Sequence, residues 1–349
     1  MQVDVLRQLL QVPGPSGDEA AAGRVWRNAA AAFADRVEVD VRGSSLAVLE
    51  GSGPRILLAG HIDEIGIMVS HIDEHGFLFF SGIGGWDVQV LVGQRIRLLG
   101  RKGEIIGVIG KQPIHLLKPE ERTQASKIED LWIDIGAQNQ AEAAEQVRVG
   151  TVGVIDAPII DLPGGRLASR SIDNRIGAFT VLEALRLLAA DRPAATVAAV
   201  ATSQEEITFA GAYTSAFQFA PDAAIIVDVT FATDSPNSDK RRLGDVRLGG
   251  GPVLSRGSAN SPVVFEMLVA AAERESIPYA VQVNPRATGT DADAIALVRN
   301  GVACGVVSIA NRYMHSPNEM IQLSDVEQAA KLIAAFVRDL TDTAMLLPE

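Results

Sequence analysis

The sequence contains a single cysteine, which limits the kinds of site that it can build. Cys304 lies inside the apolar stretch 302–310 and is the only cysteine among 349 residues. It cannot form an internal disulfide, and a structural zinc site that uses several thiolates is excluded.

An excess of basic charge and long apolar runs are also missing. The chain has 31 Lys and Arg against 43 Asp and Glu, a net charge of −12, which argues against a nucleic-acid partner. No uncharged apolar stretch reaches the about 20 residues that a membrane span needs. The first residues include Asp4 and do not resemble a signal peptide. With 47% hydrophobic and 21% charged residues, we expect a globular, cytoplasmic protein.

Two regions of the chain, residues 1–69 and 162–349, show alternating helix and strand patterns, which is typical of an α/β domain. Pro13 and Gly14 end the first predicted helix, and Ser16 is a candidate cap for the second. Ser324 and Glu327 have the spacing of a capping box for the last helix. Helices are predicted at 3–12, 18–33, 175–190, 262–275, 291–300 and 325–345, and strands at 37–41, 46–49, 55–60, 195–202, 223–229, 279–283 and 302–310.

The segment between these regions has a different pattern. Short apolar segments recur between turn residues at 77–81, 95–99, 105–109, 131–135 and 151–155, with a hairpin turn at 101–104 and one helical signal at 141–146. The sequence therefore predicts a mixed-sheet, three-layer α/β catalytic domain (1–69 and 162–349) with an inserted, small all-β, barrel-like domain (70–161). We expect this insert to lie away from the functional site.

Polar residues follow four of the predicted strands and form a candidate metal site. These residues are His61, the pair Glu205 and Glu206, Asp228 and His315. Ligands of open α/β sheets bind at the carboxyl ends of strands. Imidazole and carboxylate groups together suit Zn²⁺, Co²⁺ or Mn²⁺.

Each of these residues also has a simpler interpretation. His61 and Asp63 can be an ordinary polar loop, or Asp63 can orient the His61 imidazole toward a metal. Glu205 and Glu206 can be a solvated pair, but directly after an apolar strand two like charges need a cation or a proton. Asp228 is harder to explain without a partner, because it interrupts an apolar run.

Four further residues were weighed for the site. Asp173 stands just before a predicted helix and can simply be its N-cap. His71, His75 and His115 lie in the β insert and look like loop or surface residues.

Seven motifs occur in order from near the amino terminus to the last helix: GHIDEIGIMV at 60–69, SIDNRIG at 171–177, SQEE at 203–206 with GA at 211–212, IVD at 226–228, GGGP at 249–252, GTD at 289–291 and YMHSPNE at 313–319. Together they resemble the co-catalytic metallopeptidase family forty-two, the glutamyl and deblocking aminopeptidases whose members form tetrahedral TET particles. The segment 107–110 with Pro113 and His115 is similar to that family's dimerisation domain.

The resemblance implies two divalent ions, Zn²⁺ or Co²⁺ with Mn²⁺ as a third candidate. It assigns His61 and Asp228 to the first ion, Glu206 and His315 to the second, and Asp173 as the bridge between them. It also implies that Glu205 is the general base and that Asp63 orients His61. Ile172 stands where the family usually has Leu, which is a conservative apolar change.

The activity that the resemblance implies is removal of amino-terminal residues from short peptides by a homo-oligomer built from dimers, up to a dodecamer. Two ions lower the pKa of a water, and Glu205 takes its proton. The alternatives are an amidase or deacylase on the same centre, an inactive metal-binding scaffold, and a glycoside hydrolase using Glu205 and Asp228. Aromatic residues make up only 5% of the chain, which argues against a sugar-binding site.

Overall fold

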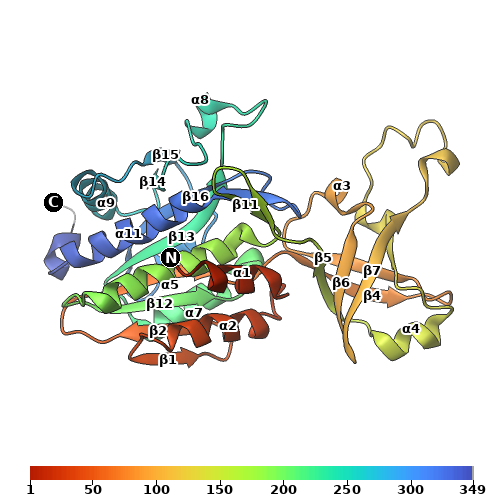
Figure 1. The fold of residues 1–349 in the computed structure, drawn as a ribbon, viewed down its shortest axis with the longest axis horizontal. Coiled ribbons are helices and arrows are strands. Elements are labelled where there is room, and N and C mark those ends of the chain that lie inside the picture. Colours follow the sequence, from red (N-terminus) through yellow and green to blue (C-terminus); the bar gives the residue numbers. More distant parts are fainter. Residues whose placement is uncertain (348–349) are drawn as a thin grey trace.

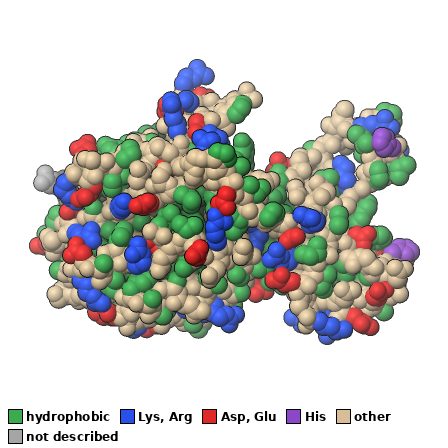
Figure 2. Space-filling view, in the orientation of Figure 1, with side chains coloured by type: hydrophobic (Ala, Val, Ile, Leu, Met, Phe, Trp, Pro, Cys, Tyr) green, Lys and Arg blue, Asp and Glu red, His purple; other side chains and the backbone are tan. Residues whose placement is uncertain are grey.

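The chain forms an α/β body and a separate β-barrel, which lie side by side along the longest axis of the molecule (Figure 1). The structure is a computed structural model and describes residues 1–347. Within these residues, none of the helices combines the length and apolar character that a bilayer span requires. Acidic and basic side chains are interspersed over the face seen in Figure 2, and the basic ones of α8 (Lys240–Leu243) stand on a projection.

The α/β body is built on a mixed eight-stranded sheet. In spatial order the strands are β1 (Arg36–Val39), β2 (Ser45–Leu49), β12 (Thr196–Thr202), β3 (Arg55–His61), β13 (Ala223–Phe231), β16 (Ala303–Asn311), β14 (Val253–Gly257) and β15 (Ala280–Asn284). The four central strands β12, β3, β13 and β16 are mutually parallel, while β2 and β14 pair antiparallel on either side. Strands covered on both faces are largely apolar, and every residue of β12 is buried.

Helices cover both faces of this sheet, which gives the predicted three layers. Leu58 points to one face and packs in a core with helices α1 (Val3–Gln11), α2 (Ala20–Ala30), α5 (Ile172–Ala190), α9 (Pro262–Arg274) and α11 (Leu323–Asp339). Leu57 points to the other face and packs with α7 (Ala210–Phe219) and α10 (Ala292–Ile295). The alternation of neighbouring strand residues between two cores follows from the period of two in a strand.

The inserted part is a closed six-stranded barrel, which confirms the barrel-like prediction. Its strands run in the order β4 (Gly66–Ile72), β5 (Leu78–Ile83), β8 (Leu131–Asp134), β7 (Gly103–Lys111), β6 (Arg95–Gly100) and β9 (Val152–Ile155). The predicted hairpin joins β6 to β7, and Gly103 takes a positive φ of 131° in its turn. The insert also carries α3 (Val88–Leu91), α4 (Gln140–Gln146) and the 3-10 turns η1 (Ile114–Leu116) and η2 (Ile128–Asp130). A small sheet of β10 (Ile160–Leu162), β11 (Arg166–Ser169) and β17 (Glu319–Gln322) lies outside the barrel.

Predictions for the last helix and for α10 were wrong. The last helix begins at Leu323 with no side-chain cap, so Ser324 and Glu327 form no capping box. Strand β17 leads directly into this helix, and the Leu323 N–H donates to the carbonyl of Gly165. The helix ends at Asp339, and a separate 3-10 turn follows at η3 (Thr343–Leu346). Helix α10 has only four residues of the ten expected.

Ser16 does not cap the second helix. Helix α2 begins at Ala20 with Glu19 at the N-cap position and no side-chain cap. The Ser16 hydroxyl donates instead to Asp63 at 2.5 Å, which uses its side chain in the site described next.

Candidate metal centre

The carboxyl ends of the central strands bring the predicted site residues together. His61 ends β3, directly beside Thr202 at the end of β12. The short helix α6 (Glu205–Thr208) follows β12 and carries both glutamates. Asp228 lies in β13, and His315 follows β16. Parallel strands place these ends at one edge of the sheet, so residues far apart in the sequence meet there.

Asp173 contacts both histidines, one with each carboxylate oxygen. The Oδ1 atom lies 3.3 Å from His61 Nε2, and Oδ2 lies 3.2 Å from His315 Nε2. His61 Nε2 also lies 3.6 Å from Glu205 Oε2 and 3.9 Å from Asp228 Oδ1. The other histidine lies 3.7 Å from Glu206 Oε2. Six of the seven residues predicted for the site therefore form one cluster in space, in which Asp173 lies between the two histidines.

The donor atoms of this cluster fit divalent cations. Two overlapping groups each offer three ligand atoms within 4.8 Å of one another: His61, Glu205 and Asp228 in one, and His61, Asp173 and Glu206 in the other. The Oε1 atom of Glu206 is buried and has no hydrogen-bond partner among the described residues. Buried polar atoms normally have a partner, and a bound cation would supply one here.

Three acids of the cluster, Glu205, Glu206 and Asp228, have raised pKa values because they are buried. Burial also acts to raise the pKa of Asp173, but the two histidines hold it below its usual range. Burial, together with Asp228 and Asp291, raises the pKa of Glu205 to about 10. Burial and the Asp173 carboxylate raise the pKa of Glu206 to about 8. Burial lowers the pKa of His61, but the surrounding carboxylates raise it by more. Such opposed shifts mark a site that concentrates negative charge for a cation.

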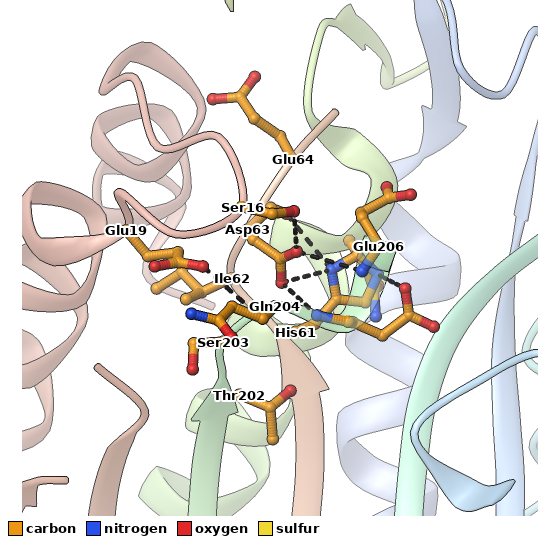
Figure 3. Close-up of polar contacts among 12 residues, drawn as sticks. Ser16, Glu19, His61, Ile62, Asp63, Glu64, Thr202, Ser203, Gln204 and Glu206 are labelled. Atoms are coloured by element: carbon orange, nitrogen blue, oxygen red, sulfur yellow. Dashed lines mark hydrogen bonds and ion pairs between the residues drawn. The ribbon is translucent and has the colours of Figure 1, made fainter. Parts of the chain in front are cut away.

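Asp63 connects His61, at the end of β3, to helix α6, which carries the two glutamates (Figure 3). Its carboxylate accepts the backbone N–H of Glu205 at 3.1 Å and of Glu206 at 3.2 Å, besides the Ser16 hydroxyl. Its Oδ1 atom lies 3.4 Å from His61 Nδ1. Asp63 therefore fixes helix α6 and lies behind the imidazole at the same time.

Asp173 is not the helix cap that its position allowed. Its carboxylate contacts His61 and His315, at 3.3 and 3.2 Å, and its ψ of 107° belongs to a kink near the start of α5. The Asn174 side chain instead accepts the N–H of Gly177 at 3.0 Å. Because Asn174 caps the helix, the Asp173 carboxylate is left to face the histidines. His71, His75 and His115 are exposed on the barrel, as predicted.

Two buried acids of the site had no role in the sequence analysis. Glu319 accepts the backbone N–H of Asp173 and of His315, both at 2.9 Å. Asp291 accepts the Thr202 hydroxyl, and its Oδ1 atom has no partner among the described residues. Asp291 ends the motif GTD at 289–291, and Glu319 ends the motif YMHSPNE at 313–319. The only sequence signal for a role was an acidic residue beside a turn, in Asp291, or at the start of a strand, in Glu319.

A cavity of about 370 Å³ opens onto the cluster. Its charged lining residues all belong to the candidate metal site. The rest of its wall comes from Val229, Thr230, Phe231, Leu243, Gln282, Asn284, Thr288, Gly289, Thr290, Val306, Ser308 and Met314. The cavity can therefore hold a substrate against the cluster.

The model of the M42 glutamyl aminopeptidase family matches residues 43–332. The chain belongs to the M42 family. It is 37% identical to the lysyl aminopeptidase of Pyrococcus furiosus over 341 residues, which cover 97% of each chain. The TET aminopeptidase of a marine Thaumarchaeota archaeon superposes with a TM-score of 0.94 at 33% identity, over 99% of this chain and 97% of that one.

A second similar structure is that of a protein that forms large assemblies. The TET1 peptidase of Pyrococcus horikoshii, which can assemble into a tetrahedron or a large octahedral shell, superposes with a TM-score of 0.87 at 31% identity, over 97% of this chain and all of that one. Membership of the M42 family makes this chain an aminopeptidase, a hydrolase of peptide bonds. The glycoside hydrolase and amidase readings are not favoured.

Proposed function

We propose that the chain removes the amino-terminal residue from short peptides with two divalent cations and Glu205 as general base. The observation that carries this proposal is the position of Asp173 between His61 Nε2 and His315 Nε2, at 3.3 and 3.2 Å. In this assignment Asp173 is shared by both ions. His61 and Asp228 complete the first site, and Glu206 and His315 complete the second. Zn²⁺, Co²⁺ and Mn²⁺ all suit these donors.

The bound ions would polarise the scissile carbonyl and lower the pKa of the attacking water. Glu205 lines the cavity, so its carboxylate can take the proton of that water and return it to the leaving amine. Glu206 cannot share this task in the proposal, because it serves as a ligand. Asp63 holds the backbone of both glutamates and so keeps the base and the ligand in fixed relative positions.

The cluster also suits a free amino terminus. Four carboxylates surround the end of the cavity, and a peptide's α-amino group can carry a positive charge, which an internal peptide bond lacks. This favours an exopeptidase. An amidase or deacylase would use the same centre, and it differs only in accepting substrates whose amino group is blocked.

The assembly in this proposal is a homo-oligomer of dimers, up to a dodecamer, with residues 70–161 as the dimerisation domain. Ile106 and Val108 on β7 are each 49% exposed, which gives the barrel an apolar outer surface. The tetrahedral assembly of the Pyrococcus horikoshii relative supports the same idea. The cytoplasmic location stays a prediction of the sequence.

The test is hydrolysis of aminoacyl-p-nitroanilides by protein that is stripped with a chelator and reloaded with Zn²⁺, Co²⁺ or Mn²⁺. We expect activity to vanish on stripping and to return with metal, while amino-blocked substrates stay intact. Cleavage of the blocked substrates would favour the amidase. Two bound ions without any cleavage would contradict the proposed activity.

A further inference from the structure

The inserted barrel reaches the candidate metal centre, which contradicts the expectation that it lies away from the site. The contact is made by the turn 84–86, which joins β5 to α3. Although the barrel stands at one end of the molecule (Figure 1), this turn lies against two residues proposed for the second cation, His315 and Glu206.

The first contact fixes the imidazole of His315. The carbonyl oxygen of Gly85 lies 2.8 Å from His315 Nδ1. A carbonyl only accepts hydrogen bonds, so Nδ1 must carry the proton. The other nitrogen, Nε2, then keeps its lone pair in the neutral ring, and this is the atom that faces Asp173 at 3.2 Å. Partners of this kind select the tautomer and orientation of a metal-binding histidine.

The second contact is the packing of the turn against Glu206. A Cβ atom added to Gly84 would lie 3.3 Å from Glu206 Oε2, 3.4 Å from Glu206 Cβ and 2.6 Å from Ile65 Cγ2. Gly84 also has a φ of +74°, which disfavours any other residue. A side chain at position 84 would therefore clash with Ile65 and crowd Glu206.

The position of the turn is set by the barrel. The indole N–H of Trp86 donates to the carbonyl of Gly66 at 2.7 Å, and Gly66 is the first residue of β4. Asp87 caps the following short helix by accepting the N–H of Gln89. These two contacts hold the carboxyl end of the turn, and at its amino end Ile83 of β5 pairs with Gly66 of β4.

We propose that the turn 84–86 positions the second cation site, so that the barrel is part of the metal centre. Its Gly85 carbonyl sets the tautomer of His315, and the glycine at position 84 leaves the Glu206 side chain room beside the turn. This inference rests on the proposed assignment of His315 and Glu206 to one cation. It implies that a shift of the barrel relative to the α/β body alters the affinity for that cation.

The test compares glycine variants of the barrel by metal binding. Gly84→Ala adds a methyl group against Glu206 and Ile65. Gly93→Ala is the matched control, because Gly93 has a φ of +79° in the same insert and no described atom within 4 Å of an added Cβ. Zinc affinity of stripped, full-length protein is measured by competition with a chromophoric chelator. We expect Gly84→Ala to weaken one of the two ions by about 10- to 100-fold, and Gly93→Ala to bind both as the unaltered protein does.

A gentler pair of variants covers the case in which Gly84→Ala does not fold. Trp86→Phe removes the bond that holds the turn, whereas Trp132→Phe replaces a half-buried tryptophan of β8 whose ring packs against Phe77. We expect weaker binding of the second ion in Trp86→Phe alone. Full binding in both turn variants, or equal loss in their controls, would overturn the inference. If the unaltered protein binds two ions but cleaves no peptide, the proposed function fails while this metal-binding test still decides.

Discussion

The Asp63 carboxylate accepts the backbone N–H of Glu205 at 3.1 Å, although the two residues lie 142 positions apart in the chain. Through this bond the loop after β3 sets the position of the helix that follows β12. The same carboxylate lies 3.4 Å from His61 Nδ1. A substitution at Asp63 therefore disturbs the candidate metal site from two sides.

Asp63→Asn is expected to lower metal affinity or activity by about 10- to 100-fold, the usual effect of losing a group that orients a ligand. An amide keeps the size of the carboxylate but turns an NH₂ group toward one of its present donors. Metal affinity and kcat are measured together. Asp73→Asn is the control, because Asp73 also accepts backbone N–H groups, in a turn of the barrel. Equal losses in the two variants would speak against a positioning role.

Glu205→Gln is expected to keep both ions and to reduce kcat by about 10²- to 10⁴-fold, since the amide cannot accept the proton of the water. Glu206→Gln is the matched comparison and is expected to lose metal as well as activity. Metal content is measured by elemental analysis of dialysed protein. Loss of metal in Glu205→Gln would make Glu205 a ligand and reverse the assignment of the two glutamates.

Substrates with an uncharged amino-terminal side chain are expected to be preferred. Beyond the candidate metal ligands and Glu205, the residues lining the cavity include no charged side chain, and burying an unpaired charge is costly. We expect kcat/KM for leucine and methionine p-nitroanilides to exceed that for lysine and glutamate by at least about tenfold, which corresponds to roughly 1.4 kcal/mol. A clear preference for lysine or glutamate would mean that a charged group outside this wall reaches the substrate.

Glu64→Gln is expected to destabilise the protein by about 3–5 kcal/mol, because it leaves buried arginine charge without a partner. Glu64 pairs with Arg170 and, at 2.8 Å, with Arg175, and all three side chains are buried. The free energy of unfolding is measured from urea titrations. Glu327→Gln is the control, since it removes the half-exposed pair with Lys331, which is expected to contribute at most about 0.5 kcal/mol. A similar decrease in the free energy of unfolding in both variants would show that the buried pair stabilises the protein no more than the exposed one does.

Cys304 is expected to be inert toward thiol reagents in the folded protein. Burial raises the pKa of its thiol to about 12, and the thiolate is the reactive form. Labelling with a disulfide reagent should be negligible at neutral pH and complete in denaturant. Rapid labelling without denaturant would show that β16 opens locally.

Most of the candidate ligands could be predicted because they lie at or just after the end of an apolar strand, and strand ends in such a sheet converge. Asp173 did not carry this signal and was assigned only through the family resemblance. His61, Asp228 and His315 all carried this signal. The Gly85 carbonyl could not be found in this way, because a backbone atom leaves no mark in the sequence. Its contact depends on how the insert is placed against the α/β body. Asp291 and Glu319 were missed for a related reason, since their importance comes from burial that only the fold creates.

The helix-cap predictions failed because contacts with residues far away in the sequence involve the same groups. Ser324 and Glu327 have the spacing of a capping box, but the Gly165 carbonyl already accepts the first N–H of α11. Ser16 has a capping side chain, but Asp63 accepts its hydroxyl. The three layers and most strands of the main sheet were predicted well, because their apolar periodicity reflects burial over many residues. Strands β14 of that sheet and β4 of the barrel were missed.

The closure of the barrel restricts how two copies of this chain can meet there. A closed barrel offers no edge strand, so two barrels cannot extend one another's hydrogen-bond ladder. Any contact between them has to be made by outward-facing side chains such as Ile106 and Val108. Backbone pairing is largely indifferent to side-chain identity, whereas a side-chain surface can change at single positions. Relatives can therefore diverge in how they assemble without altering the barrel itself.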